Sequence, residues 1–182
     1  MNALETQRPA PALVRLLQLA YSAERAAAFA YQGHAGSVNA PDLVASLGQI
    51  EAEEWHHREC VLTIMNELGV SVSRWFELKY FVIGKFISAS CYVIGWFMPM
   101  YFAGRLESGN VNEYFELVRL LHAHGTQQYD TVLNEMAVVE KEHEMFFLEQ
   151  VRHHWMLPLF QPLFWWGPGY SFNELPAQPI EE

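Results

Sequence analysis

Two pairs of glutamate and histidine with identical spacing are the residues of this sequence best suited to bind a metal ion. Glu54 is followed three residues later by His57, and Glu140 is followed three residues later by His143. Residues three apart on a helix share a face, so both side chains of a pair can reach one ion. A single pair of this kind is also common on solvated helix faces, so the spacing alone is weak support for a site.

The position of each pair on its helix strengthens the prediction. Glu54 and His57 share the apolar stripe of their helix with Val61. Glu140 and His143 lie on a comparable stripe. A carboxylate on such a stripe is expected to be buried, and a buried charge without a partner is strongly unfavourable. Each glutamate therefore needs a bound cation or a proton.

A third pair with the same spacing, Glu53 and His56, lies beside the first. It falls next to Gln49 and Cys60, on a more polar face of the same helix. We therefore interpret this pair as lying outside the site.

Two single glutamates complete a set of six residues. Glu24 lies on the apolar face of the first expected helix, nine residues before Gly33, and Glu116 lies nine residues before Gly125. The two halves of the chain are therefore laid out alike, each with a single glutamate, a turn and then Glu-x-x-His. Glu113 lies one helical turn from Glu116 on nearly the same face, and it is the alternative to Glu116.

A set of four glutamates and two histidines predicts a site for two metal ions. Di-iron and di-manganese carboxylate bundles have this arrangement, with one Glu from each of two helices and Glu-x-x-His from each of the other two. Carboxylate-rich sites with one imidazole per ion suit iron or manganese, whereas structural zinc prefers thiolates or more histidines. We therefore expect two iron ions, with manganese as the alternative.

The elements that must position these residues are helices, so the expected fold class is all-α. Apolar residues at three- and four-residue steps predict amphipathic helices over 10–32, 41–69, 111–124 and 127–155. Ser108, Gly109 and Asn110 are expected to form the turn before the third of these helices. The expected architecture is one four-helix bundle over residues 1–157, followed by an irregular aromatic tail over 158–182.

An apolar segment separates the second and third amphipathic helices. Residues 80–104 are almost wholly apolar or aromatic, with Lys85 as their only charge. The segment is long enough to span a bilayer, but Gly84, Gly95 and Pro99 interrupt it. Three interpretations stay open: a helical element at a lipid interface, which we favour, a buried helix or helix pair of the bundle, and a true span.

Composition limits the remaining function classes. The chain has 182 residues, a formal net charge of −10 and 51% hydrophobic residues, which is typical of one folded domain with a sizeable core. An acidic chain lacks the basic surface that nucleic acid binding needs, so no nucleic acid partner is expected. Cys60 and Cys91 have no metal-ligand or redox spacing, and residues 1–14 show no signal-peptide pattern. The cytoplasm is therefore the expected location.

These residues resemble the ferritin-like di-iron superfamily and, within it, the demethoxyubiquinone hydroxylase family of quinone biosynthesis. The likeness covers roughly residues 21–147. Residues 21–24 (Tyr-Ser-Ala-Glu) are similar to that family's His-Ala-Gly-Glu segment. Residues 54–57 and 140–143 match its two Glu-x-x-His motifs, and the apolar segment resembles its membrane-contacting part. The resemblance implies that the four-helix bundle is ferritin-like.

The resemblance also implies two further functional residues. Glu116 followed six residues later by His122 is similar to the family's third-helix glutamate and nearby histidine, which favours Glu116 over Glu113. Tyr31 falls where the family has a tyrosine. Tyr31 and His122 would orient ligands or relay protons and electrons. Ala23 stands where the family has glycine, the turn between the last two helices is shorter, and the C-terminal ending differs.

The function that the resemblance implies is that of an oxidoreductase. The enzyme that the resemblance implies would be an O2-dependent di-iron monooxygenase that hydroxylates an apolar, quinone-like or lipid-soluble molecule, with an external electron donor. Peripheral membrane contact and assembly into a homo-oligomer are further expectations. The alternatives are a ferritin-like iron oxidase or peroxide-scavenging protein, and a membrane-associated scaffold with a vestigial site.

Overall fold

The computed structural model describes residues 8–168 and 170, and all of the regular structure in these residues is helical. Six helices follow one another along the chain: α1 (Pro11–Ser37), α2 (Pro41–Glu67), α3 (Arg74–Ser90), α4 (Phe97–His124), α5 (Asp130–Val151) and α6 (Leu157–Phe164). The expected all-α class is confirmed.

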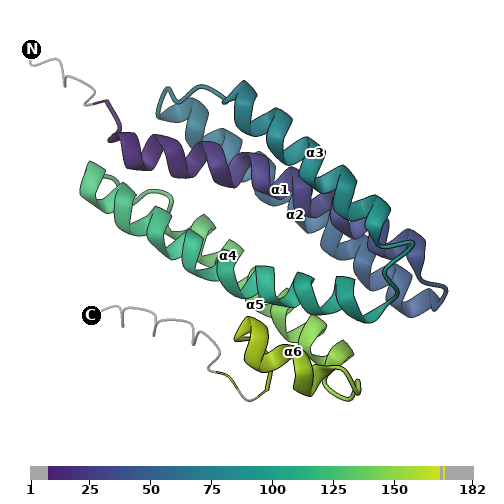
Figure 1. Ribbon diagram of the computed structural model, residues 1–182. Helices are drawn as coiled ribbons and strands as arrows, with labels where there is room; N and C mark the ends of the chain where they lie inside the picture. The colour runs from purple at the N-terminus through teal and green to yellow at the C-terminus, as the bar shows by residue number, and fades with distance from the viewer. Residues whose placement is uncertain (1–7, 169, 171–182) are drawn as a thin grey trace, which may run out of the picture.

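Two antiparallel helix pairs form the main body of the molecule (Figure 1). α1 packs along α2, and α4 packs along α5. Less extensive contacts of α1 with α4 and of α2 with α5 join the two pairs into a bundle. α3 lies along α1, outside the four helices of the two pairs. It has no extensive contact with α4, so the space beside α1 between α3 and α4 is less tightly packed.

Local signals in the sequence place the helix ends. Pro11 and Pro41 are the first residues of their helices, where the missing N–H would have had no helical partner. The hydroxyl of Ser73 caps α3 by accepting a hydrogen bond from the backbone N–H of Phe76. Gly125 ends α4 in the left-handed conformation, at φ 89°, which glycine adopts without strain.

The turn expected at Ser108, Gly109 and Asn110 is wrong, because α4 runs without a break through these residues. Gly109 faces open space. A glycine inside a helix costs only about 1 kcal/mol relative to alanine, which the packing of the neighbouring turns can offset. The third amphipathic helix therefore begins at Phe97, fourteen residues before the expected start at Val111.

The apolar segment 80–104 is divided between two helices. Its first part completes α3, a turn with a left-handed glycine at Gly95 follows, and its last part begins α4. One side of the segment is buried, as at Gly84, and the other side is exposed, as at Phe86 and Val93. Among the described residues, none of the helices has both the length and the apolar character that crossing a bilayer requires.

The tail expected over 158–182 is not irregular at its start, because α6 forms there. Proline is tolerated in the first turn of α6, and apolar side chains bury its inner face against the bundle. Beyond α6, Trp166 is buried, and its backbone carbonyl accepts a hydrogen bond from the hydroxyl of Tyr101 at 2.9 Å. Residues 169 and 171–182, the rest of the expected tail, lie outside the described residues.

Small residues allow α3 to approach α1 closely. A Cβ atom added to Gly84 would lie 2.7 Å from the Cα of Ala26, and one added to Gly33 would lie 2.5 Å from the Cα of Ser88. Both distances are too short for carbon atoms, and the groups met are backbone, which cannot swing aside. The two helices would have to separate to accept a side chain at either position.

An ion-pair network holds the N-terminal end of α3 on the bundle. The carboxylate of Glu77 lies 2.8 Å from the Nη2 of Arg58 and 3.0 Å from the Nη1 of Arg25. The guanidinium of Arg58 also lies over the ring of Tyr21, 3.6 Å from its centre. These contacts join α3 to both α1 and α2.

Replacing Gly84 with alanine should destabilise the protein by about 1–3 kcal/mol, because the new methyl group forces α3 away from α1. Gly48→Ala is the matched control. Gly48 lies inside α2 with no atom within 4 Å of the added methyl group, so its replacement should stabilise the helix by about 0.5–1 kcal/mol. Urea unfolding followed by circular dichroism measures both, and equal stability of Gly84→Ala and the wild type would contradict the close contact.

Candidate metal centre

Six buried acidic and histidine side chains meet inside the bundle, from α1, α2, α4 and α5. None is more than 5% exposed, and they are Glu24, Glu54, His57, Glu107, Glu140 and His143. They form two groups, each offering four ligand atoms that lie within 4.8 Å of one another. The groups are Glu24, Glu54, His57 and Glu140, and Glu54, Glu107, Glu140 and His143. Glu54 and Glu140 belong to both groups, so each of their carboxylates could contact two ions if both groups held one.

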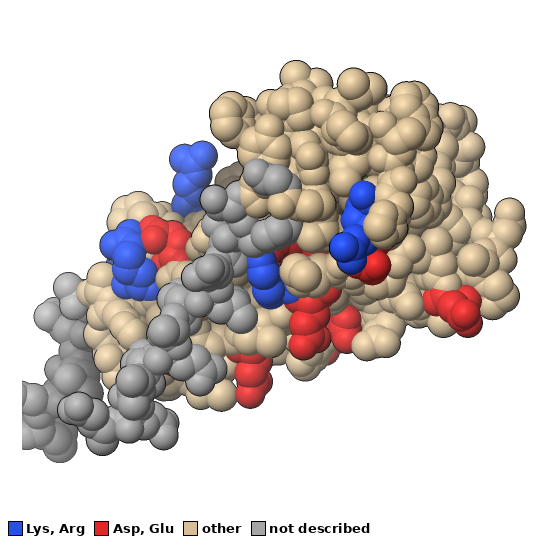
Figure 2. Space-filling model, turned by 90° about the horizontal axis from the view of Figure 1, so that it is seen from below, with Lys and Arg blue, Asp and Glu red and all other residues tan. Residues whose placement is uncertain are grey.

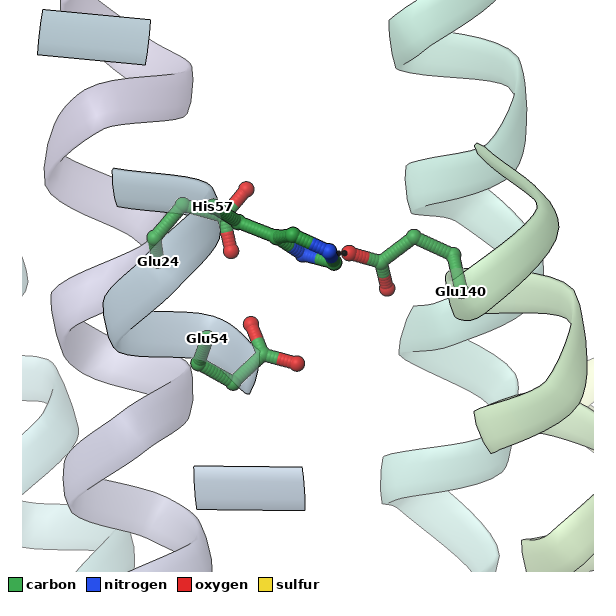
Figure 3. Close-up of side chains that lie close together, drawn as sticks. All are labelled: Glu24, Glu54, His57 and Glu140. Carbon is green, nitrogen blue, oxygen red and sulfur yellow. Dashed lines mark hydrogen bonds and ion pairs between the residues drawn. The ribbon is translucent and has the colours of Figure 1, made fainter. Parts of the chain in front are cut away.

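The first group shows how three helices contribute to one site (Figure 3). Glu24 comes from α1, Glu54 and His57 from α2, and Glu140 from α5 on the opposite side. All four side chains point into the same space. The Nδ1 of His57 lies 3.0 Å from the Oε1 of Glu140. The spacing argument from the sequence thus corresponds to side chains that meet.

The structure brings five of the six predicted ligands together, and Glu116 is the exception. The side chain of Glu116 is 45% exposed, and its Oε1 lies 2.6 Å from the Nη2 of Arg119 on the same helix. Glu107 occupies the place that was expected for Glu116. Glu113, the alternative, belongs to neither group. The ligand expected from the third amphipathic helix is therefore corrected to Glu107.

Glu107 escapes prediction from the sequence because residues 108–110 suggest a turn. On the continuous helix α4, Glu107 follows the buried Gly104 by three residues and precedes the buried Val111 by four. It therefore lies on the buried stripe of α4. The test of helical phase that selects the α2 pair would select Glu107 as well, once the helix is extended toward its true start.

Several polar atoms of the cluster have no hydrogen-bond partner within the described part of the chain. Neither carboxylate oxygen of Glu54 has one, although the Nδ1 of His143 lies 3.4 Å from its Oε1. The Oε1 of Glu107 also has none. Leaving buried carboxylate oxygens unpaired is costly, and cations held between these residues would remove that cost. The chain's oxygen-rich donor set, with one imidazole for each group, fits iron or manganese.

Burial and mutual repulsion control the protonation of the cluster. Burial raises the pKa of Glu54 well above its usual value, and repulsion by Glu140 and Glu24 raises it further. Burial likewise raises the pKa of Glu107, with repulsion by Glu140 adding to the effect. Burial also acts on Glu140, but hydrogen bonds from Glu107 and His57 outweigh it and lower the pKa of Glu140 to about 2. Without cations, Glu54 and Glu107 therefore keep their protons to higher pH than an exposed glutamate does.

Glu53 contacts a histidine of the cluster, although neither Glu53 nor His56 belongs to the two groups of candidate ligands. Its Oε2 lies 2.7 Å from the Nε2 of His143. The Nδ1 of His143 faces the cluster, so this contact fixes the ring with its other nitrogen toward the cluster carboxylates. A carboxylate behind a metal-binding histidine commonly has this function.

Two polar residues of α4 support the cluster carboxylates. The side-chain amide of Asn110 donates to the Oε2 of Glu107 at 2.8 Å and to the Oε2 of Glu140 at 3.3 Å. The hydroxyl of Tyr114 donates to the Oε1 of Glu24. Asn110, which we expected in a turn, therefore links a carboxylate of α4 to one of α5.

The placement of His122 does not support the functional role expected for it. It lies fifteen residues after Glu107 on α4, which is about 22 Å along the helix axis. Its Nε2 lies 2.7 Å from the Oδ2 of Asp130, and this half-exposed pair joins the end of α4 to the start of α5. Tyr31, the other residue expected to assist, is buried and stacks on Phe147 at 5.5 Å between ring centres.

An apolar cavity of about 630 Å³ adjoins the cluster between α1, α3 and α4. It lies where α3 packs on α1 without packing extensively on α4. Glu24 and Glu107 of the cluster form part of its wall. Phe86, Ile94 and Leu106 also line it and are themselves exposed, so the cavity adjoins the surface. Its size and apolar lining suit a small organic molecule.

No protein-family model matches the chain, and neither a curated protein nor a solved structure matches it.

In the presence of a chelator, Glu107→Gln should reduce the loss of stability that the protein suffers as pH rises. The raised pKa means that the folded protein keeps the proton of Glu107 above about pH 4–5, where an unfolded glutamate releases it. The wild type therefore loses stability as pH rises through that range and beyond, whereas glutamine cannot ionise. The free energy of unfolding of Glu107→Gln, relative to that of the wild type, should therefore be higher at pH 8 than at pH 5.

Glu116→Gln is the control for this comparison. Glu116 is exposed, and the hydrogen bond from Arg119 lowers its pKa, so its replacement should change the pH dependence little between pH 5 and pH 8. If Glu107→Gln and the wild type depend on pH equally, the assignment of Glu107 to the cluster is wrong.

Proposed function

We propose that this chain is a di-iron, O2-dependent oxidase or hydroxylase that acts on an apolar small molecule. The observation that carries the proposal is the contact between the apolar cavity and the acidic cluster. The cavity wall includes Glu24 from one group of ligands and Glu107 from the other. An organic molecule in the cavity would therefore lie beside both ion positions.

The same arrangement supports a ferritin-like bundle. α1 and α4 supply one glutamate each, at Glu24 and Glu107, while α2 and α5 supply the two Glu-x-x-His pairs. This division of ligands among four helices is the one found in ferritin-like di-iron proteins. α3 is then the additional helix, and it forms one wall of the cavity.

Two iron ions held by the cluster would activate O2 for hydroxylation; one oxygen atom would enter the substrate, and two electrons from an external donor with two protons would reduce the other to water. The chain itself contributes positions and the exclusion of water. Glu53 holds the ring of His143, while Asn110 and Tyr114 hold carboxylates of the cluster. The apolar cavity walls orient the substrate and keep water from the reacting end. Manganese would fit the same donors. Iron is the proposed metal because the proposed reaction is an O2-dependent hydroxylation.

An iron oxidase or peroxide-scavenging protein would use the same cluster and is the alternative. Such a protein takes up ions or peroxide, both of which are polar. Apart from the residues at the cluster, the cavity is lined mainly by alanine, isoleucine, phenylalanine and methionine side chains. This lining favours an apolar organic substrate over a polar one.

An exposed apolar surface adjoins the cavity. On α3 and the turn after it, the exposed residues are Trp75, Leu78, Phe81, Val82, Phe86, Tyr92, Val93 and Ile94. Around α6 they are Trp155, Leu159, Leu163 and Trp165. Seen from the side of α6, a broad area of the molecule has no charged side chains (Figure 2). We propose that this surface makes peripheral contact with lipid, from which an apolar substrate enters the cavity.

Iron loading without oxygen, followed by exposure to O2, tests the proposed chemistry. Wild-type protein given ferrous iron in large excess and no reductant should stop consuming O2 once two ions per chain are oxidised. Sustained uptake that turns over the added iron would instead support the iron oxidase. Glu54→Ala and Glu140→Ala should bind less iron, since each removes a bridging carboxylate, whereas Glu116→Ala should bind as much as the wild type. Unchanged iron content in both bridging variants would refute the site.

Polar replacements at Phe86 and Ile94 test the lipid contact. A Phe86→Ser, Ile94→Ser double variant should bind phospholipid vesicles several-fold more weakly in a sedimentation assay and keep its iron, because both side chains are exposed and lie away from the cluster. Val138→Ser with Met145→Ser is the matched control, since these exposed residues of α5 do not line the cavity. Equal vesicle binding by both double variants and the wild type would contradict lipid contact at this surface.

A further inference from the structure

One polar side chain in the cavity has no part in the metal cluster. His34 of α1 lines the cavity and is 2% exposed. Neither of its ring nitrogens has a hydrogen-bond partner within the described residues. Nearly all buried polar groups in proteins are hydrogen-bonded, so an unpaired imidazole at a cavity calls for a partner that occupies the cavity.

His34 and the cluster lie at opposite ends of the cavity. Glu24 and His34 both line it and are ten residues apart on α1, which is about 15 Å along the helix axis. Between them the cavity wall contains Ala27 and Ala30, whose small side chains leave room for a ligand. A molecule that fills the cavity therefore meets polar groups at its two ends and apolar ones along its length.

The other small polar groups near this end already have partners. The hydroxyl of Ser90 donates to the carbonyl of Phe86 at 2.8 Å, and the thiol of Cys91 donates to the carbonyl of Ile87 at 3.2 Å. Both bonds lie within the last turn of α3 and its cap. His34, by contrast, is buried at this end of the cavity with both ring nitrogens unpaired within the described residues.

The surroundings of His34 define what it can bind. Burial lowers the pKa of His34 to about 4, so the imidazole is neutral near pH 7, with one nitrogen that donates and one that accepts. The rings of Tyr31 and Phe147 lie edge-on to it, at 5.5 and 6.4 Å between ring centres. A neutral imidazole beside aromatic rings suits an uncharged oxygen and disfavours an ionised group.

We propose that His34 determines substrate specificity by hydrogen-bonding a hydroxyl or carbonyl oxygen at one end of an elongated apolar molecule, whose other end lies against Glu24 and Glu107. The position of the reacting end rests on the proposed function, whereas the hydrogen bond itself needs no metal chemistry. A hydrocarbon without such an oxygen leaves the imidazole unpaired and binds more weakly. Sites that hydrogen-bond a substrate oxygen discriminate against analogues that lack it.

A pair of probes of nearly equal size and shape tests this role. 1-Naphthol and naphthalene differ by one hydroxyl group, and their binding to the full chain can be measured under argon, where no oxygen chemistry occurs. The preference for 1-naphthol is the ratio of its affinity to that of naphthalene. This ratio should be about three- to tenfold larger in the wild type than in a variant without the imidazole. His34→Phe should lose that extra preference and bind naphthalene as well as the wild type does, because phenylalanine keeps an apolar ring in the same place.

His153→Phe is the control, because His153 is exposed, does not line the cavity, and its replacement should leave the preference unchanged. Should His34→Phe fold poorly, the 15N resonances of the His34 imidazole in the wild type give a second measurement, and 1-naphthol but not naphthalene should shift them. An equal preference in His34→Phe and the wild type, or unshifted resonances, overturns the proposal. Iron content measured on the same samples is independent of this result, so loss of the metal site would be recognised separately.

Discussion

The burial of four carboxylates in the middle of a helical bundle is the constraint on which the rest of this structure depends. The acidic cluster lies between two apolar cores. One core contains Leu13, Leu117 and Leu133, and the other contains Leu47 and Phe147, each fully buried. Apolar packing at both ends holds the four helices together against the repulsion of the glutamates between them. Two bridging cations would turn that repulsion into attraction, so the same residues that weaken the metal-free fold would stabilise the metal-bound one.

The asymmetry of the bundle decides what reaches the cluster. On one side α2 and α5 supply the two Glu-x-x-His pairs, and on another side α3 is held at α1 by the close contact at Gly84 and by the ion pairs of Glu77. Because α3 follows α1 and has no extensive contact with α4, an apolar cavity remains beside Glu24 and Glu107. The close helix contact and the cavity are thus two consequences of one arrangement. The cavity thus connects the buried acidic cluster to the surface, as the proposed entry of an organic molecule requires.

Spacing and helical phase are enough to predict the cluster residues of α1, α2 and α5, such as Glu24 and Glu54. The reason is that the buried face of a helix can be recognised from the local sequence alone. The fourth glutamate was misplaced because the local turn signal at residues 108–110 was overridden by the packing of α4, which no short window of sequence contains. The contact between Glu53 and His143 joins two helices far apart in the chain, and its detection needs the fold. The cavity likewise depends on how three helices diverge, and α6 depends on apolar contacts with the bundle.

We propose that the cluster, with Glu107 in place of Glu116, holds two neighbouring ions bridged by Glu54 and Glu140. X-ray absorption spectroscopy of the iron-loaded protein, combined with its measured iron content, tests this most directly. The account predicts two iron ions per chain, separated by about 3.5–4 Å, with nitrogen and oxygen ligands only. A single ion per chain, or iron without a second iron at that distance, would contradict it.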